Sequence, residues 1–397
     1  MKKLILTILI IHFSLVIANA QWVQMSNGMG TNITVWSLAV SGNNIFAGTV
    51  SYGVYLSTDN GATWTSTVMN NSDVYSLAVI ENNIFAGISG KGVYLSTNNG
   101  VTWTQTALNN KIVLSLAVQG NNIFAGTDPE GVYLSTNSGV TWNQTDLNNR
   151  IIHSLAVKGN NIFAGADGVY LSTNNGSTWT QTGLNNYDVW SLAVNENNIF
   201  AGTENGVYLS TNNGTIWTQI GLSNIYVKSL AVNGNNIFAG TYNNGIYLYI
   251  YDGSTWIQKN QGFSLSPSVL SIIFTNNYIL AGTYEQSVWR RSLSEIIGIQ
   301  VISTIIPKGY DLSQNYPNPF NPTTKIKFDI TGHTVGQTFL SVYDITGREI
   351  QTLVNEKLNP RTYEVTFDGS QLPSGVYFYQ LSVGNDIIAF KKMILLK

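Results

Sequence analysis

The feature that most constrains the fold of this chain is an internal repeat. The tetrapeptide Ser-Leu-Ala-Val, or its relative Ser-Ile-Ile-Phe, recurs at steps of 39, 39, 39, 37, 38 and 42 residues. Each copy is followed by a segment close to Asn-Asn-Ile-Phe-Ala-Gly, then by one close to Gly-Val-Tyr-Leu-Ser-Thr, and then by a turn that ends in Trp. Because these segments are short, rich in β-branched and aromatic residues and bounded by Asn and Gly, each repeat predicts four antiparallel strands. The copies begin at Ser37, Ser76, Ser115, Ser154, Ser191, Ser229 and Ser271.

The number of strands predicts a closed ring. Four strands in about 40 residues form one blade of a β-propeller. The last repeat ends at its third strand, Val288-Trp289-Arg290, whereas Trp22-Val23-Gln24 near the N-terminus matches the fourth strand Trp103-Thr104-Gln105. Pairing this N-terminal strand with the last repeat would remove open sheet edges. We therefore predict an all-β chain with a seven-bladed β-propeller at residues 21–296, in which the N-terminal strand closes the last blade.

The N-terminus has the pattern of a secretory signal peptide. Lys2 and Lys3 precede an apolar run that ends at Ile17, and Ala18-Asn19-Ala20 supplies a small-residue cleavage site. The apolar run is short for a bilayer, so the pattern favours a cleaved signal over a membrane anchor. We assign residues 1–20 to the signal peptide and expect a mature chain without a transmembrane span, outside the cytoplasm.

Composition excludes several kinds of chemistry. The chain has no cysteine, which excludes disulfides, thiol nucleophiles and Cys-ligated zinc. It has only three His, too few for a His-rich metal site, and a formal net charge of −2, unlike the basic surfaces that bind nucleic acid. We therefore expect no cofactor, no metal and no nucleic-acid partner.

The turn between the third and fourth strands resembles the Asp-box, or BNR repeat, with its pattern Ser-x-Asp-x-Gly-x-Thr-Trp. Five copies are near-complete, although only Asp59 keeps the acid and Ile216 replaces the Thr of the fifth copy. The resemblance implies a structural turn away from any active site. An Asx side chain accepts bonds from nearby amides, and Gly tolerates a positive φ. The residues assigned to this turn are Asp59, Gly61, Trp64, Asn98, Gly100, Trp103, Asn137, Gly139, Trp142, Asn174, Gly176 and Trp179.

Asp-box propellers include sialidases and glycoside hydrolases, so enzymatic activity is an alternative. A sialidase would need three convergent Arg, but the predicted propeller has only Arg150, Arg290 and Arg291, and the last two should face opposite sides of a strand. Glycoside hydrolysis needs two carboxylates about 5–10 Å apart. Asp73 and Asp188 occupy the same position in different repeats and could form such a pair, although solvated loop acids are the simpler interpretation. A glycoside hydrolase or lyase that uses them on polysaccharide remains open.

Two loops of each repeat vary in sequence, whereas the other turns are nearly uniform. One loop precedes Ser-Leu-Ala-Val and the other joins the second and third strands, so both lie on the same face of an up-and-down blade. Loops on a rigid scaffold often carry binding residues, and aromatic rings beside acids suit glycans. Neutral drift of exposed loops is the competing explanation. Our first hypothesis is a non-enzymatic binding or adhesion protein for a glycan or protein ligand, with ligand-binding residues Trp36, Tyr75, Tyr187, Trp190, Tyr226 and Tyr242.

The C-terminal segment resembles the type A C-terminal sorting domain of the type IX secretion system, found in gliding and related outer-membrane bacteria. Four ordered segments carry the resemblance: Leu312–Thr324, Val342–Glu349, Leu372–Tyr379 and Lys391–Lys397. Alternating strands joined by Asp-Gly and Ser-Gly turns independently predict a small Ig-like β-sandwich.

We place this sorting domain at residues 309–397, after a linker at residues 297–308. The resemblance implies that the signal peptide directs the chain into the periplasm and that the type IX machinery carries it to the outer cell surface or the medium. The residues assigned to the sorting signal are Asn315, Pro317, Asn318, Pro319, Phe320, Gly347, Gly375, Lys391 and Lys392.

Overall fold

The structure is a computed structural model in which the chain divides into two compact units. One unit spans Gln21–Val301 and the other contains Ile302–Lys397. The predicted signal peptide lies outside the described residues. The structure describes residues 21–195, 198–234, 236–250, 256–293, 296, 298–303, 305–331, 336–358, 360–370, 372–384 and 386–397. In these ranges no helix is long and apolar enough to cross a membrane.

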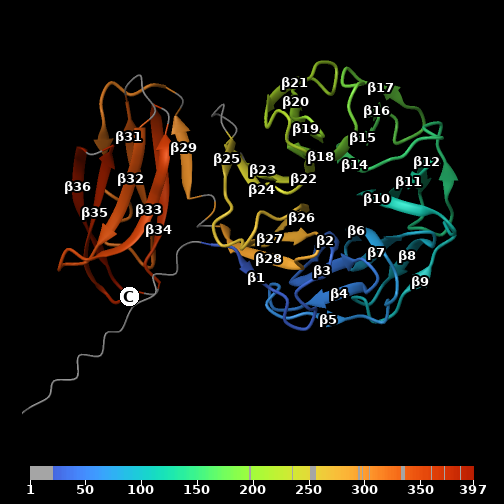
Figure 1. Cartoon of the computed structure of the whole chain (residues 1–397), viewed down its shortest axis with the longest axis horizontal. Coiled ribbons are helices and arrows are strands. Elements are labelled where there is room, and N and C mark those ends of the chain that lie inside the picture. Colours follow the sequence, from blue (N-terminus) through green and yellow to red (C-terminus); the bar gives the residue numbers. More distant parts are fainter. Residues whose placement is uncertain are drawn as a thin grey trace, which may run out of the picture. The chain divides into compact units, whose positions relative to one another are not determined.

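Antiparallel four-stranded sheets arranged around a common axis form the N-terminal unit (Figure 1). The described residues of this unit form seven such sheets, which we number blade 1 to blade 7 in the order of their first strands. Blade 1 contains β2 (Val35–Ser41), β3 (Asn44–Thr49), β4 (Gly53–Ser57) and β5 (Thr65–Ser66). Blade 2 contains β6 (Val74–Ile80), β7 (Asn83–Ile88), β8 (Gly92–Ser96) and β9 (Thr104–Gln105). Blade 3 contains β10 (Ile112–Gln119), β11 (Asn122–Asp128), β12 (Gly131–Ser135) and β13 (Asn143–Gln144).

The remaining blades continue the pattern around the ring. Blade 4 contains β14 (Ser154–Lys158), β15 (Asn161–Ala166), β16 (Gly168–Ser172) and β17 (Thr180–Gln181). Blade 5 contains β18 (Val189–Asn195), β19 (Asn198–Thr203), β20 (Gly206–Ser210) and β21 (Thr218–Gly221). Blade 6 contains β22 (Val227–Asn233), β23 (Asn236–Thr241), β24 (Gly245–Ile250) and β25 (Trp256–Gln258). Blade 7 contains β26 (Val269–Phe274), β27 (Tyr278–Thr283), β28 (Val288–Ser292) and β1 (Val23–Gln24).

The first strands of the blades form a closed inner ring. Each first strand contacts that of the next blade, and β26 of blade 7 contacts β2 of blade 1. The apolar second strands pack one blade against the next: Phe46 of blade 1 is fully buried in a cluster with Ile84 and Ala86 of blade 2. Leu280 of blade 7 fills the same position against blade 1. The repeated Ile-Phe-Ala segment therefore supplies the apolar contacts between blades.

The glycine that follows this segment is required by the close approach of neighbouring blades. At Gly48, a Cβ atom would lie 2.8 Å from Val74 Cγ1 of blade 2 and 2.4 Å from Ser37 Oγ. Both distances are far below ordinary van der Waals contact, so the recurrence of Gly at this position has a packing cause.

Strand β1, at the N-terminal end of the unit, is the fourth strand of blade 7. Val23 pairs with Arg290 and Gln24 pairs with Trp289 in antiparallel register. Trp22, just before β1, is 2% exposed, stacks on Phe263 with ring centroids 5.1 Å apart, and donates from Nε1 to the Lys259 carbonyl at 2.7 Å. The first and last strands of the unit thus lie in one sheet.

In blades 1 to 5 the turn before the short fourth strand is held by side-chain hydrogen bonds. In blade 1, Ser57 Oγ accepts from the Gly61 amide at 2.8 Å, and Asp59 Oδ1 accepts from the Thr63 amide at 2.9 Å. Gly61 adopts φ +81°, a conformation that favours glycine. The Asn copies keep the geometry, since Asn98 Oδ1 accepts from the Thr102 amide at 2.9 Å. These bonds account for the uniform sequence of this turn.

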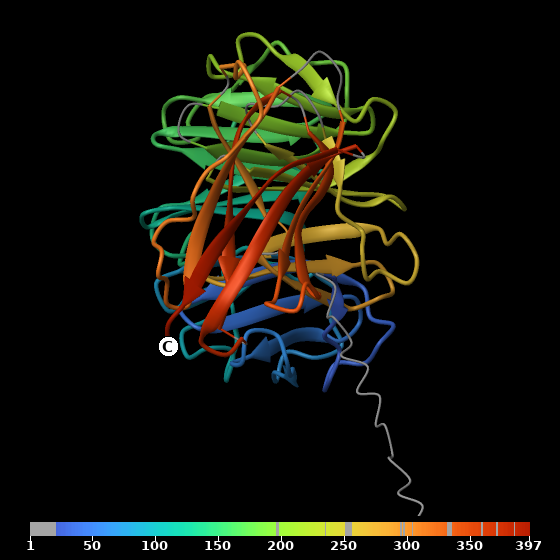
Figure 2. The same cartoon turned by 90° about the vertical axis from the view of Figure 1, so that its left-hand side faces the viewer.

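The C-terminal unit is a sandwich of two antiparallel sheets whose long strands run side by side (Figure 2, orange and red). Buried Phe328, Leu340, Tyr379 and Leu381 contribute to its core. The first sheet has the order β29 (Ile299–Ser303), β34 (Arg361–Asp368), β31 (Thr323–Ile330) and β30 (Asp311–Leu312). The second has the order β33 (Glu349–Leu358), β32 (Gly336–Tyr343), β35 (Gly375–Val383) and β36 (Asp386–Leu395).

The segment expected to be a linker, residues 297–308, contains a strand. β29 lies within it and forms an edge of the first sheet of the sandwich. Ile299, Val301 and Ile302 give this segment a high β-propensity, which favours a strand over an irregular linker.

Candidate ligand-binding site

One position of the repeat lines a cavity of about 350 Å³ on the propeller axis. The position immediately precedes the Ser of the repeated tetrapeptide, at the start of the innermost strand of each blade. All seven copies lie in the cavity wall: Trp36, Tyr75, Leu114, His153, Trp190, Lys228 and Leu270. Asp128 and Ile151 complete the lining. We call this the ring cavity.

In six of the seven blades a β-bulge turns this side chain toward the axis. In blades 1, 2, 3, 5, 6 and 7 the register between the first and second strands shifts at this residue, for example between Val35 and Ser37. The flanking Val35 and Ser37 are both buried, whereas Trp36 between them is only partly buried. An extra residue in one strand re-aims its side chain. The bulge therefore makes this position a lining position in successive blades.

The lining has an apolar side. The rings of Trp36 and Tyr75 meet edge to face, with centroids 5.6 Å apart and planes at 78°. Leu270 of blade 7 and Leu114 of blade 3 flank this pair in the order of the blades. These four residues form the apolar part of the lining.

The other side carries a stack of rings and one ammonium group. His153 stacks on Trp190 with ring centroids 4.0 Å apart, and Lys228 Nζ lies 3.5 Å from the Trp190 centroid. Lys228 Nζ also lies 4.3 Å from the Tyr226 centroid and donates to Tyr226 Oη at 3.0 Å. His153 and Lys228 belong to the blades on either side of Trp190. Trp190 therefore orients its neighbours and is not an open platform.

Burial perturbs the ionisation of this side. It lowers the pKa of Lys228 to about 8. Burial also lowers the pKa of His153, and the nearby Lys228 ammonium lowers it further, whereas the negative charge of Asp188 partly offsets this decrease. Burial and the charge of Asp188 raise the pKa of Tyr226 to about 12, so its hydroxyl stays protonated and can accept from Lys228 at neutral pH.

The predicted ligand-binding aromatics divide into three groups. Trp36, Tyr75 and Trp190 line the ring cavity. Tyr226 and Tyr242 extend from it, with the Tyr226 centroid 5.4 Å from that of Trp190 and 6.0 Å from that of Tyr242. Tyr187 lies elsewhere: it packs against the core of blade 5, 5.2 Å from the ring of Tyr208.

The two acids of the hydrolase hypothesis lie outside the lining. Asp73 Oδ1 accepts from the Ser51 amide at 2.7 Å and holds a loop of blade 1, while Asp188 is exposed. The carboxylate in the lining belongs to Asp128. Leu114, His153, Lys228 and Asp128 were not among the predicted binding residues, although the first three share the repeat position of Trp36.

A second cavity, of about 510 Å³, lies at the uniform turns between blades 1 and 7. Asn43, Asn60, Asn276 and Asn277 are among its lining residues. We call it the seam cavity. Its wall is mostly amide and hydroxyl groups from repeated turns, which offer no feature that distinguishes it from ordinary solvated surface.

In the C-terminal unit, several predicted sorting residues have structural contacts. Asn315 is 2% exposed, donates from Nδ2 to Thr324 Oγ1 at 2.9 Å, and donates its amide to Tyr379 Oη at 2.8 Å. Asn318 Oδ1 accepts from the Ile394 amide at 3.0 Å, and the buried Phe320 donates its amide to the Ile394 carbonyl at 2.9 Å. These residues join the segment between β30 and β31 (residues 313–322), which we call the entry segment, to β35 and β36.

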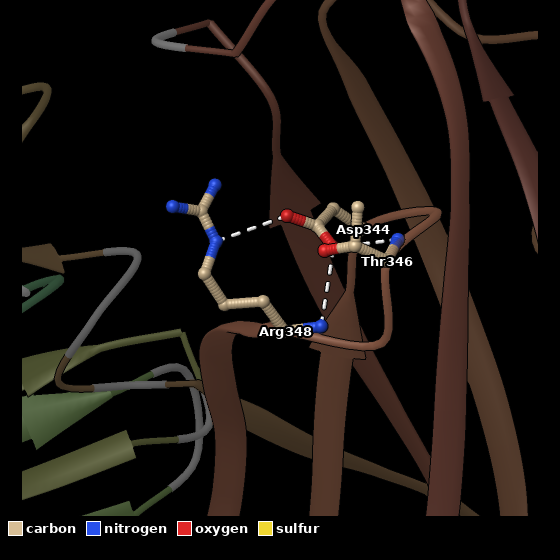
Figure 3. Close-up of polar contacts among 3 residues, drawn as sticks. All are labelled: Asp344, Thr346 and Arg348. Atoms are coloured by element: carbon tan, nitrogen blue, oxygen red, sulfur yellow. Dashed lines mark hydrogen bonds and ion pairs between the residues drawn. The ribbon is translucent and has the colours of Figure 1, made fainter. Parts of the chain in front are cut away.

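Gly347 belongs to a turn organised by Asp344 (Figure 3). Asp344 Oδ1 accepts from Thr346 Oγ1 at 2.6 Å and from the Arg348 amide at 3.1 Å, and Oδ2 accepts from Arg348 Nε at 3.0 Å. The Thr346 hydroxyl is the largest cause that lowers the pKa of Asp344 to about 2. Gly347 has φ +80°. The other predicted sorting residues lie at the start of β35 (Gly375), on β36 (Lys391 and Lys392) and in the entry segment (Pro317 and Pro319).

Comparison with known proteins identifies the C-terminal unit. Residues 314–396 match the family model of the secretion system C-terminal sorting domain. This domain indicates export to the cell surface or extracellular space and interaction with the type IX secretion machinery. No curated protein matches the sequence.

Solved structures show the fold of the N-terminal unit. An extracellular domain described for a one-component system of B. thetaiotaomicron is 19% identical with a TM-score of 0.60, covering 79% of this chain and 46% of that one. The WD40 β-propeller domain of Doa1 is 15% identical with a TM-score of 0.55, covering 69% and 97%. YCF48 from Cyanidioschyzon merolae is 13% identical with a TM-score of 0.56, covering 69% and 98%. At these identities the likeness is one of fold alone, a β-propeller.

Proposed function

We propose that this chain is a secreted or surface-displayed binding protein whose seven-bladed, Asp-box-like propeller takes a glycan or protein ligand in the ring cavity without turning it over. In this proposal a signal peptide is cleaved after Ala20, and the sorting domain then takes the chain across the outer membrane. The propeller is the cargo, and its ligand lies outside the cell.

The observation that carries the proposal is the contrast between the lining and the rest of the repeat. The strands and turns repeat almost unchanged, yet the one position that lines the ring cavity holds Trp, Tyr, Leu, His, Trp, Lys and Leu in the seven blades. Half-buried aromatic, cationic and apolar groups around a cavity of a few hundred Å³ are typical of small-ligand sites. A protein ligand is the second possibility, since the related fold of YCF48 has been solved with a bound D1 peptide.

The hydrolase alternative has less support. The positions of Asp73 and Asp188 outside the lining leave Asp128 as the carboxylate of the ring cavity. Paired-carboxylate chemistry requires two such groups across the scissile bond. A polysaccharide panel tests this alternative directly: turnover that vanishes in Asp73→Asn would establish it.

Glycan-array binding tests the main proposal. We expect the purified protein to bind a defined set of glycans, Trp36→Ala to lose that binding, and Tyr52→Ala to keep it. Tyr52 is the matched control, because it lies on a variable loop of the same blade, is 53% exposed and does not line the ring cavity. Binding that survives Trp36→Ala, or that is lost equally in Tyr52→Ala, would refute the ring cavity as the site.

A further inference from the structure

We propose that the ring cavity recognises a carboxylate group beside Lys228, and that its ligand is an acidic glycan containing uronic acid residues. This deepens the proposed function and rests on it. Three features of the cavity support it: the charge environment of Lys228, the aromatic faces that remain free, and the acid in the lining.

Among the described residues, Lys228 has no anionic partner. Two other cations of the variable loops are paired with acids: Lys111 Nζ lies 2.9 Å from Glu130 Oε1, and Arg150 forms an ion pair with Asp167. A third, Lys91, donates to Ser72 Oγ instead. No carboxylate of the described residues lies within ion-pair distance of Lys228 Nζ. Its ammonium group lies over two aromatic faces, and within the described part of the chain it donates one hydrogen bond, to Tyr226 Oη.

An ammonium group has three donors, and one of them is accepted by Tyr226 Oη in the described structure. Burial without an anion disfavours the charged form, in agreement with the lowered pKa of Lys228. A ligand carboxylate would supply the missing charge and accept the remaining donors. Charge-assisted bonds of this kind are about twice as strong as neutral ones. An ammonium-bearing ligand at this place would be repelled.

The two Trp residues of the lining differ in how far neighbouring side chains cover their rings. Trp190 already contacts the His153 ring and the Lys228 ammonium from the two neighbouring blades. Trp36 and Tyr75 meet edge to face and lie in the wall away from that stack. A sugar ring would therefore pack its C–H face against the Trp36 side while its carboxylate reaches Lys228.

Asp128 completes the recognition of a sugar acid. Its carboxylate lines the same cavity but does not form an ion pair with Lys228 in the described structure. A free carboxylate in a sugar site accepts hydrogen bonds from hydroxyl groups. The cavity thus offers one cation for the acid group, one anion for hydroxyl groups and an apolar wall for the ring.

The affinity should depend on pH through Lys228. Tyr226, on the same segment, and His153, on the other face of Trp190, are the titratable groups near Lys228. The acids of this region are Asp128, Asp188 and Glu204, whose charges raise the pKa of His153 or of Tyr226. A bound carboxylate favours protonated Lys228. Affinity is therefore full below about pH 8 and falls as the pH rises through that value. Protonation of His153 below its lowered pKa would strengthen binding further.

Isothermal titration calorimetry with oligogalacturonate, with the neutral galactose oligosaccharide and with acetate tests the proposal. At pH 7 we expect the protein to bind oligogalacturonate about tenfold or more tightly than the neutral sugar, as one charge-assisted bond suggests. Lys228→Met, which keeps a side chain of similar length over Trp190, should remove this preference. Lys91→Met should not, because Lys91 donates to Ser72 Oγ on a variable loop and does not line the ring cavity. At pH 9.5 the wild-type preference should fall, while Lys228→Met stays unchanged.

The outcomes separate this inference from the proposed function. Equal affinity for the acidic and neutral sugars, with loss of both in Trp36→Ala, would overturn the carboxylate proposal and leave the binding function standing. A preference that survives Lys228→Met would also overturn it. Binding of acetate as tight as that of oligogalacturonate would overturn the assignment to a glycan. No binding of either sugar would refute acidic-glycan recognition, and the glycan array decides whether the wider binding function fails with it.

Discussion

Removal of the Trp22 side chain should open the ring where its two ends meet. Trp22 is almost fully buried between blades 6 and 7, and its indole N–H donates to the Lys259 carbonyl at 2.7 Å. Truncation of a buried aromatic residue to Ala costs about 3–5 kcal/mol, and loss of a buried hydrogen bond adds about 1 kcal/mol. We therefore expect Trp22→Ala to lower the free energy of unfolding of the propeller by about 4–6 kcal/mol.

Urea unfolding followed by tryptophan fluorescence measures this loss. All 10 Trp residues lie between residues 22 and 289, so the signal reports on the propeller and not on the sorting domain. Val23→Ala is the matched control: Val23 is adjacent and 46% exposed, and its truncation should cost about 0.5 kcal/mol or less. A loss below about 1 kcal/mol for Trp22→Ala would refute the argument that the N-terminal strand closes the ring.

Three further variants test other parts of the account. Gly48→Ala places a Cβ 2.8 Å from Val74 Cγ1 and should destabilise the propeller by about 1–3 kcal/mol in the same urea assay. Gly42→Ala is the control, because its Cβ meets nothing within 4 Å. It should lose only the free energy that an Ala residue costs at a φ of +58°. Tyr379→Phe removes the hydroxyl that accepts from the Asn315 amide and donates to the Ser313 carbonyl, and should lower the melting temperature of the sorting domain; an unchanged melting temperature would contradict that role. Because hydrogen bonds lower the pKa of Asp344 from 3.8 to about 2, its carboxylate contributes stability that is present above about pH 4 and lost as the pH falls toward 2. Asp344→Asn should therefore lower stability at pH 7 and reduce the acid dependence between these values, as followed by thermal melts.

The repeat made most of the fold predictable. Period, strand propensity and the match of Trp22-Val23-Gln24 to Trp103-Thr104-Gln105 are local or arithmetical properties of the sequence. The bounds of β29 were missed because a short apolar segment between two domains can be strand or linker until its partner, here β34, is known.

The candidate site was only partly predictable, because a bulge decides which side chains face the axis. The sequence identified variable loops and selected aromatic residues in them, which found Trp36, Tyr75 and Trp190. It could not separate Tyr187, which packs on blade 5, from Trp190, three residues later, since alternation along a strand breaks at a bulge. Lys228 was missed because only its contacts with the surrounding rings mark it as a binding residue. One of these rings, Trp190, belongs to another blade, so the sequence does not show the contact.

The sorting segment illustrates a different limit. Its motif residues were assigned to recognition by resemblance, yet Asn315 and Phe320 are 2% exposed and hold the entry segment against the last strands. A sequence motif does not distinguish a residue that a partner touches from one that keeps the touched surface in place. Burial makes that distinction for these two residues.

A crystal structure of the protein with an acidic oligosaccharide selected on the array would show whether the ring cavity binds a sugar acid. We expect the ligand in the ring cavity, with its ring against Trp36 and Tyr75 and a carboxylate oxygen within hydrogen-bond distance of Lys228 Nζ. A ligand found in the seam cavity against Asn43 and Asn277, with the ring cavity holding only water, would contradict it.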